Sequence, residues 1–363
     1  VLKEGEAVVR MKALTDEESD AMQMRFPVYV HGMVKQVPKT GVIRANQTRT
    51  RIKFEVPAAR RAAQSRLELR YSPTLAGAMV DALPYLVSYP YGCTEQTLNR
   101  FLPTVITQQT LRRMGVDLEA IRNKRTNLNA QEIGDDQQRA GQWRRYRHNP
   151  VFDEDEVAAM VSAGVKRLAA MQLSDGGWGW FSGYGEHSYP HTTAVVIHGL
   201  QIARENKAAI PGGVIERGVQ WLKDYQAKEI ERLILWDRTQ KKGKSRADNL
   251  DAYVYMVLTD EAFENKKMRD YLYRDRNSLA VYAKAMFGMA LVKAEDSQKL
   301  AMIIKNIEQF LVRDDENQTA YLNLPNANYW WYWYGSEYEA HAYYCLLYTS
   351  PSPRDQRPNL VCR

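Results

Sequence analysis

Apolar and polar positions near the start of the chain follow a period of two. The runs Val8 to Leu14 and Met22 to Val30 partly alternate, and Ile43 and Arg49 to Val56 offer further strands. Alternation with this period is typical of half-buried β-strands, whose successive side chains point to opposite faces. We therefore expect β structure over residues 1–68.

From Ser72 onward the period becomes helical. A first helix is predicted over residues 75–83, and we expect Pro84 to end or kink it. The next helical run covers residues 97–114. A segment that is poor in apolar residues follows over 122–150, and we interpret it as a solvated insertion loop.

A repeated pair of helices then occupies the chain up to residue 347. In each pair an amphipathic helix precedes a mostly apolar one, and the predicted pairs are 157–171 with 192–203, 215–225 with 250–258, 269–273 with 279–290, and 300–310 with 339–347. Helices of these two kinds pack as a double ring with the apolar set inside. The repeat predicts a mainly α protein folded as an α/α toroid.

One short stretch, Tyr89 to Gln96, places a cysteine and a glutamine three residues apart after a Pro/Gly turn. At the start of a helix this spacing puts both side chains on one face, so a Cys93 thiolate can reach the Gln96 carbonyl. Loss of ammonia would leave an internal thioester, a stored electrophile for an amine or hydroxyl. Cysteine and glutamine at this spacing are more often a buried hydrophobe and an ordinary helix residue, but the whole eight-residue wording favours the thioester.

The sequence Pro-Tyr-Gly-Cys-Thr-Glu-Gln resembles the thioester motif of the alpha-2-macroglobulin and complement family in its bacterial form. The usual motif is Gly-Cys-Gly-Glu-Gln, and Thr94 stands in its middle position here. The resemblance covers about residues 20–347. It implies an α/α toroid thioester domain over 69–347, preceded by a partial β-sandwich segment over 1–68. We expect the unpatterned, proline-containing tail 348–363 to be non-native or disordered.

The resemblance also implies a function. Cleavage of a bait region in the remaining domains of the full-length chain would expose the thioester, and Gln96 would acylate a lysine of the attacking protease. Such a protein is an endopeptidase inhibitor and no enzyme, because the acyl bond is consumed once. Its expected location is extracytoplasmic: periplasmic, cell-surface or secreted. The alternative is an opsonin or adhesin that tags surfaces through hydroxyls.

Hydroxyl capture is helped by a general base, usually histidine. In complement-like relatives a loop between later toroid helices supplies it. The matching loop here, Trp236 to Asp248, holds no histidine but five basic residues: Arg238, Lys241, Lys242, Lys244 and Arg246. By resemblance this favours direct attack by lysine amines. His191, which directly precedes a helix start, is the one candidate base elsewhere.

The remaining histidines are weaker candidates. His187 and His191 beside Glu186 suggest zinc, but the surrounding glycines and proline make this a loop without a third ligand. We therefore expect no metal and no cofactor. His198 and His341 lie in apolar helices, and we interpret them as satisfied core residues.

A rival pattern lies between the first two helices of the repeat. Gln172, Gly176 and Trp178 fit the Q-x-x-x-G-x-W pattern of terpenoid cyclases, another α/α toroid family. Those enzymes need an Asp-rich acid, whereas Asp153 to Glu156 is more simply an acidic helix N-terminus. The cyclase reading also leaves Cys93 unexplained and stays the weaker alternative.

The distribution of charge along the chain bears on whether it binds nucleic acid. The net charge is +7, but basic residues gather only between Arg122 and Arg147, among acids, so no nucleic acid partner is expected.

The odd set Cys93, Cys345 and Cys362 is no disulfide framework. We detect no signal peptide and no apolar run of about 18 residues. The chain opens without Met in mid-domain, as an internal fragment would. We interpret the aromatic run 329–334 as a loop packed against the ring.

Overall fold

The computed structural model describes residues 5–28, 47–60, 75–87, 92–119, 149–314, 319–324 and 336–349, with isolated positions between residues 35 and 69. The chain divides into two compact units, Val1–Glu68 and Leu69–Arg363. The predictions for the insertion loop up to residue 148, for the aromatic run 329–334 and for the tail from residue 350 lie outside the described residues.

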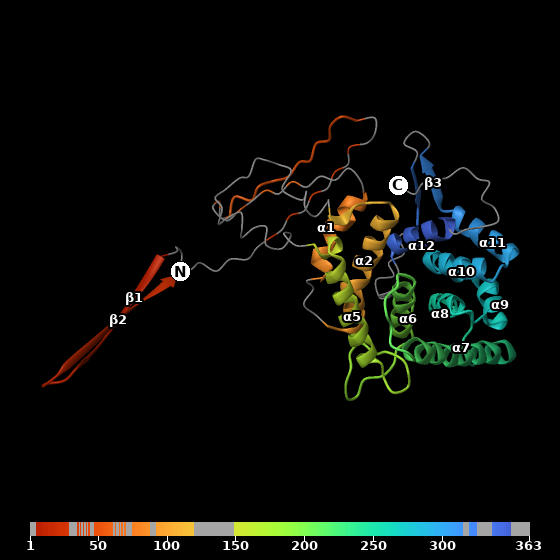
Figure 1. The fold of residues 1–363 in the computed structure, drawn as a ribbon, viewed down its shortest axis with the longest axis horizontal. Helices are drawn as coiled ribbons and strands as arrows, with labels where there is room; N and C mark the ends of the chain where they lie inside the picture. Colours follow the sequence, from red (N-terminus) through yellow and green to blue (C-terminus); the bar gives the residue numbers. More distant parts are fainter. Residues whose placement is uncertain are drawn as a thin grey trace. The chain divides into compact units, whose positions relative to one another are not determined.

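Among the described residues of the first unit, one antiparallel hairpin is formed. β1 (Gly5–Leu14) pairs with β2 (Ser19–Val28) in a register that runs from Gly5 opposite Val28 to Leu14 opposite Ser19. Figure 1 shows it as the two red arrows. The strand expected over residues 49–56 is wrong, because these residues are described and join no ladder. Alternation alone makes no strand where no partner supplies the ladder of hydrogen bonds.

The second unit is built from helices. Their bounds, with those of two short strands, are α1 Leu75–Val87, α2 Thr94–Arg113, η2 Pro150–Phe152, α5 Glu154–Met171, α6 Pro190–Glu205, α7 Val214–Thr239, α8 Asn249–Asp260, α9 Lys266–Arg274, η3 Arg276–Ser278, α10 Val281–Lys293, α11 Ser297–Glu308, β3 Leu311–Asp314, β4 Thr319–Leu322 and α12 Glu337–Thr349. None of the described helices combines the length and apolarity that crossing a bilayer requires.

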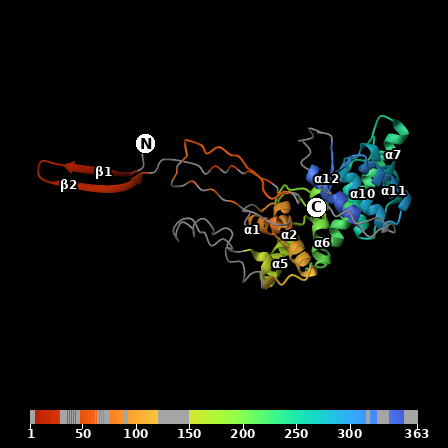
Figure 2. The same cartoon turned by 90° about the horizontal axis from the view of Figure 1, so that it is seen from above.

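These helices form two layers that alternate along the chain. The inner helices α2, α6, α8, α10 and α12 contact one another in that order. The outer helices pack against them: α1 and α5 on α2, α7 on α6 and α8, α9 on α8, and α11 on α10. Figure 1 shows the helices in chain order from orange to blue, and Figure 2 shows them from above. This arrangement confirms the α/α toroid.

The inner layer carries the core, as the apolar half of the repeat predicts. Every residue from Asp251 to Thr259 in α8 is buried. The outer helix α11 buries only Leu300, Ile303 and Ile307, one stripe of an amphipathic helix. Packing of the outer stripes onto the apolar inner helices produces one continuous cluster of buried residues from α2 to α12.

Polar caps explain where several helices begin. The Asp153 carboxylate caps α5 by accepting from the Glu156 amide at 3.0 Å, which satisfies an amide that has no partner within the helix. Asp248 and Asp251 form a reciprocal capping box at the start of α8. The acids at residues 153–156 therefore act as a helix start, as the sequence predicts.

Three details depart from the sequence prediction. Pro84 does not end α1, which continues to Val87, because Leu83 and Pro84 are both buried and packing holds that turn. The hairpin β3–β4 between α11 and α12 is not anticipated, since its strands are only four residues long. Finally, α12 runs to Thr349, two residues beyond the predicted boundary at residue 347.

Candidate functional site

The predicted Cys93–Gln96 pair lies at the start of the inner helix α2. Cys93 is the N-cap residue, its backbone is extended, and its carbonyl accepts the first helical hydrogen bond from the Thr97 amide at 2.9 Å. The side chain is 8% exposed, and its thiol forms no disulfide within the described residues. Gln96 follows in the first turn. Residues 89–91 of the motif lie outside the described part of the chain.

The Gln96 side-chain oxygen is an exception among the polar atoms of this site. It is buried and, within the described residues, accepts no hydrogen bond. A buried acceptor left unpaired costs roughly 1–3 kcal/mol, so such an atom calls for an explanation. Here the unpaired carbonyl belongs to the side chain that the motif predicts to be the acyl group.

Thr94, between Cys93 and Gln96, docks the helix start onto a distant turn. Its amide donates to the Trp180 carbonyl at 2.9 Å, and its hydroxyl donates to the Gly179 carbonyl at 2.7 Å. The Trp180 carbonyl also lies 3.1 Å from the hydroxyl. The side chain is fully buried. These bonds join the reactive turn to the loop between α5 and α6.

The residues of the Q-x-x-x-G-x-W pattern build that loop. The Gln172 side-chain amide donates to the carbonyls of Gly176 and Val214 at 2.8 and 2.9 Å, and the Trp178 indole donates to the Leu168 carbonyl at 2.8 Å. Gly176 has φ +94°, and a Cβ there would lie 2.8 Å from the Arg217 carbonyl oxygen, so only glycine fits. The pattern is thus accounted for by a structural turn.

The start of α6 is tied to the same turn. The Trp178 amide donates to the Thr193 hydroxyl at 2.9 Å, and the Tyr189 amide donates to the Trp178 carbonyl at 2.9 Å. His191 is the second residue of α6. The hydrogen bonds through Trp178 and Thr94 therefore link the start of α2 to the start of α6, which carries the candidate base.

Burial sets the protonation state of His191. Its ring lies 5.8 Å from the Tyr253 ring on α8, and burial lowers the pKa of His191 to about 4. The imidazole is therefore neutral at pH 7 and able to accept a proton. Burial also raises the pKa of Tyr253, with a smaller contribution from the Glu95 carboxylate of the motif.

The three other histidines that the structure describes make local contacts. The His187 ring packs on Tyr189 with centroids 4.2 Å apart. His341 accepts from the Leu322 amide at 2.9 Å and so joins β4 to α12. His198 lies with its Nδ1 3.8 Å from Asp260 Oδ2, and burial lowers its pKa. The described residues hold no group of three or more side chains suited to a metal ion.

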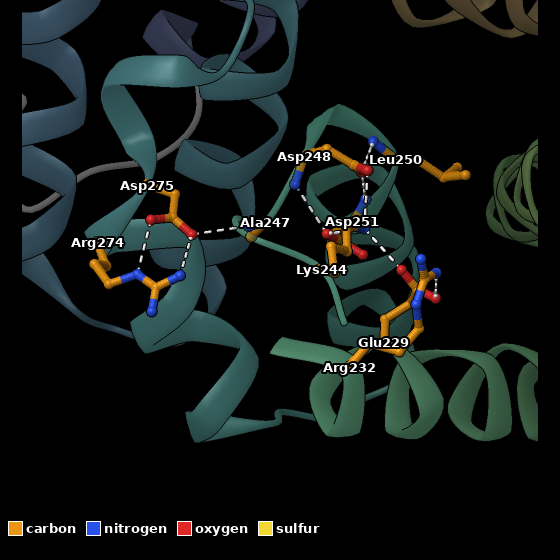
Figure 3. A network of polar contacts seen from close by, with 9 residues as sticks. All are labelled: Glu229, Arg232, Lys244, Ala247, Asp248, Leu250, Asp251, Arg274 and Asp275. Atoms are coloured by element: carbon orange, nitrogen blue, oxygen red, sulfur yellow. Dashed lines mark hydrogen bonds and ion pairs between the residues drawn. The ribbon is translucent and has the colours of Figure 1, made fainter. Parts of the chain in front are cut away.

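The loop predicted to lack a base is shorter than expected, because α7 continues to Thr239. Figure 3 shows Lys244 of this loop between Glu229 on α7 and Asp251 on α8. Its ammonium lies 2.8 Å from Glu229, 2.8 Å from Asp248 and 2.7 Å from Asp251. Gly243, with φ +105°, lets the loop approach α7 so closely that a Cβ would overlap the Arg232 carbonyl.

The charges in this network hold Lys244 in place. Burial opposes its charged form, but the Asp251 and Asp248 carboxylates outweigh burial and raise its pKa. Burial and Asp248 raise the pKa of Asp251 to about 7. Lys244 is therefore a charged, paired ammonium and no base. The spacing of Asp248 and Asp251 is a capping-box signal that the sequence analysis did not use.

Comparison with known proteins places the helical part of the chain in a family. Residues 72–339 match the family described as the A-macroglobulin TED domain. Alpha-2-macroglobulin of Thermotoga maritima is 25% identical over 217 residues, which are 60% of this chain and 11% of that protein. Thioester-containing protein 1 allele S3 of Anopheles gambiae is 22% identical over 269 residues, which are 71% of this chain and 17% of that protein.

Solved structures show the same fold. The crystal structure of a mutant of Salmonella alpha-2-macroglobulin has a TM-score of 0.50 and 20% identity, covering 78% of this chain and 15% of that chain. The structure of Salmonella alpha-2-macroglobulin reacted with methylamine has a TM-score of 0.50 and 19% identity, over 80% of this chain and 15% of that chain. The chain thus spans between about a tenth and a sixth of the length of these proteins.

Proposed function

Since the chain belongs to the A-macroglobulin TED domain family, we propose that Cys93 and Gln96 form an internal thioester that captures a nucleophile covalently. The observation that carries the proposal is the first turn of α2. Within the described residues, a buried cysteine without a disulfide occupies the N-cap position there, and the Gln96 carbonyl oxygen three residues later is buried without a hydrogen-bond donor.

The proposed chemistry balances in two steps. The Cys93 sulfur attacks the Gln96 side-chain carbon, the amide nitrogen takes up the proton of the thiol and leaves as ammonia, and a thioester remains. A lysine amine then attacks the same carbon, and Cys93 leaves as a thiolate that takes up the proton released by the amine. The second step forms a stable amide bond and consumes the thioester once.

On this proposal the protein is a protease trap. Cleavage in another domain of the full-length protein exposes the thioester, and lysine amines of the attacking protease become attached to Gln96. The protein is then an endopeptidase inhibitor, acting where foreign proteases are met, in the periplasm, at the cell surface or in the medium. The family supports this assignment, and the whole-protein activity, partners and location remain part of the proposal.

A second candidate is the tagging of surface hydroxyls. Alcohols need a general base, and the neutral His191 at the start of α6 favours this candidate. Amine capture is preferred because the loop before α8 offers no base. Its central side chain, Lys244, is charged and held by three carboxylates.

The test is the intact mass and thiol content of the full-length protein before and after methylamine. We expect the native protein to lack the mass of one ammonia and to hold Cys93 unreactive toward a thiol reagent. Methylamine should release one thiol, and Cys93→Ala should abolish that release. A Cys93 thiol that already reacts in the native protein would contradict the proposal.

A further inference from the structure

We propose that Thr94 is a positioning residue for thioester chemistry, and that its hydroxyl fixes the Cys93–Gln96 turn against the Gly179–Trp180 carbonyls. This inference rests on the function proposed above. It assigns a role to a residue that forms neither of the bonds in the reaction and that acts through the neighbours on both sides of it.

The contact is a buried hydrogen bond at the reactive turn itself. The Thr94 hydroxyl donates to the Gly179 oxygen at 2.7 Å, and the Thr94 amide donates to the Trp180 oxygen at 2.9 Å. The amide and the hydroxyl of Thr94, the first residue of α2, thus both donate to the Gly179–Trp180 turn. Rotation of the helix start would break both bonds at once.

The turn that accepts these bonds is itself braced from three helices. The Trp178 indole is bonded to the Leu168 carbonyl in α5, and the Trp178 amide to the Thr193 hydroxyl in α6. Asp175 accepts from the Trp221 indole of α7 at 2.9 Å and from the Ser188 hydroxyl at 2.7 Å. These bonds fix the loop directly before Gly179 and Trp180, so the two carbonyls that accept from Thr94 follow a segment held by three helices.

Fixed geometry matters because ring closure joins two groups on one helical turn. Bringing reacting atoms into a near-attack arrangement lowers the barrier, and a displacement of about 1 Å costs on the order of 100-fold in rate. Without the hydroxyl, the Gly179 carbonyl loses its donor and the helix start is held by one bond. We expect thioester formation to slow by about 10- to 100-fold.

The experiment compares three variants of the full-length protein. Thr94→Val keeps the shape and removes the hydroxyl, whereas Thr94→Ser keeps the hydroxyl. The matched control is Thr104→Val in the same helix, because Thr104 is also fully buried but its hydroxyl has no hydrogen-bond partner within the described residues. Each variant is assayed for the fraction of methylamine-releasable thiol, for the rate at which that fraction forms, and for the thermal unfolding midpoint.

We expect Thr94→Val to form the releasable thiol more slowly than wild type. Its unfolding midpoint should lie below that of Thr104→Val, because the buried Gly179 carbonyl loses its donor, but the protein should remain folded at the assay temperature. Thr94→Ser should behave as wild type. A Thr94→Val protein with wild-type kinetics, or a folded Thr94→Ser protein with the Val defect, would overturn the inference. A Thr94→Val protein that fails to fold would make the hydroxyl a folding determinant, which also overturns the positioning role.

Failure of this inference is separable from failure of the proposed function. If wild type releases a thiol with methylamine and Thr94→Val matches it, only the role of Thr94 is wrong. If wild type already carries a reactive Cys93 thiol, no thioester exists and both proposals are wrong.

Discussion

Single buried polar side chains hold the starts of the inner helices. Thr94 at α2 and Thr193 at α6 bond to the loop between α5 and α6, and Asp251 at α8 bonds to the amide of its own N-cap residue. The sequence predicts the Cys93–Gln96 pair because its signal is local, within the eight residues from Tyr89 to Gln96. It does not predict the partners of Thr94, which lie 85 residues away and leave no periodic trace.

His191 decides between the two candidate nucleophiles. If it is the base for hydroxyl capture, His191→Ala should abolish labelling by glycerol and leave labelling by amines unchanged. With a pKa of about 4, the neutral form exists above that value, so wild-type glycerol capture should stay constant from pH 8 to 5 and fall near pH 4. The measurement is competition between labelled glycerol and labelled amine after protease cleavage. If amine capture is the function, glycerol labelling should be negligible in both the wild type and His191→Ala.

Replacing Lys244 should lower the free energy of unfolding. Lys244→Met leaves the buried carboxylates of Glu229 and Asp251 without their cation, and we expect a loss of about 3–5 kcal/mol in the free energy of unfolding at pH 7.5. Without the Lys244 ammonium, the pKa of Asp251 should rise above its value of about 7. At pH 5 the Asp251 carboxyl is then protonated and is no longer an unpaired buried charge, so the loss in the free energy of unfolding should be smaller there.

The control for this prediction is Lys242→Met in the same loop. Lys242 is exposed, and its replacement should change the free energy of unfolding by less than about 0.5 kcal/mol. Chemical denaturation of the three proteins at both pH values provides the measurement. Equal losses for Lys244→Met at pH 5 and pH 7.5 would show that Asp251 does not gain a proton there.

At the scale of elements, the helix α2, which carries Gln96, is held between α5 and α6 by close contacts at glycines. A Cβ at Gly164 of α5 would overlap the Phe101 ring of α2, and a Cβ at Gly199 of α6 would lie 2.6 Å from the Leu98 methyl carbons. The sequence predicts that these helices exist, from their period, but gives no sign of which glycines lie at the contacts. Pro84 in α1 is the opposite case, where a local stop signal is overridden by packing.

Gly164→Ala tests this contact. Alanine gains about 1 kcal/mol of helix propensity over glycine in an exposed helix, but overpacking costs about 1–3 kcal/mol, and Phe101 is 1% exposed and cannot move aside. We therefore expect net destabilisation in a thermal melt, while Ser162→Ala on the exposed face of α5 should be nearly neutral. A more stable Gly164→Ala protein would show that α2 can shift away from α5.

At the scale of the whole molecule, the repeat in the sequence anticipates the fold because each helix pair contacts mainly its neighbours in the chain. The continuous core contains residues of the helical unit only, from Leu98 to Leu347. The hairpin of the first unit, in contrast, exposes apolar side chains such as Val8 at 50%, Leu14 at 73% and Met22 at 56%. Alternation predicts these two strands correctly, but it also predicts a strand over residues 49–56 that the structure does not form.

A chain that begins at Leu69 should therefore unfold as cooperatively as the whole chain. Among the described residues, the continuous core begins at Leu98, after that residue. Circular dichroism at the helical band during heating provides the measurement. A broad or lowered transition for the shortened chain would show that residues 1–68 contribute to the stability of the toroid.

The separation between Thr94 and its partners has a consequence for the newborn chain. Synthesis proceeds at about 5–20 residues per second, so Gly179 leaves the ribosome on the order of 4–17 s after Thr94. Until then the reactive turn has nothing to dock on, and Cys93 is an ordinary accessible thiol. Ribosome-bound chains that expose residues only up to 170 should react with a maleimide at Cys93, and those that expose residue 205 should be protected. On the proposed function, the thioester would then form only once α6 has been made, because Thr193 of α6 holds the loop that accepts from Thr94.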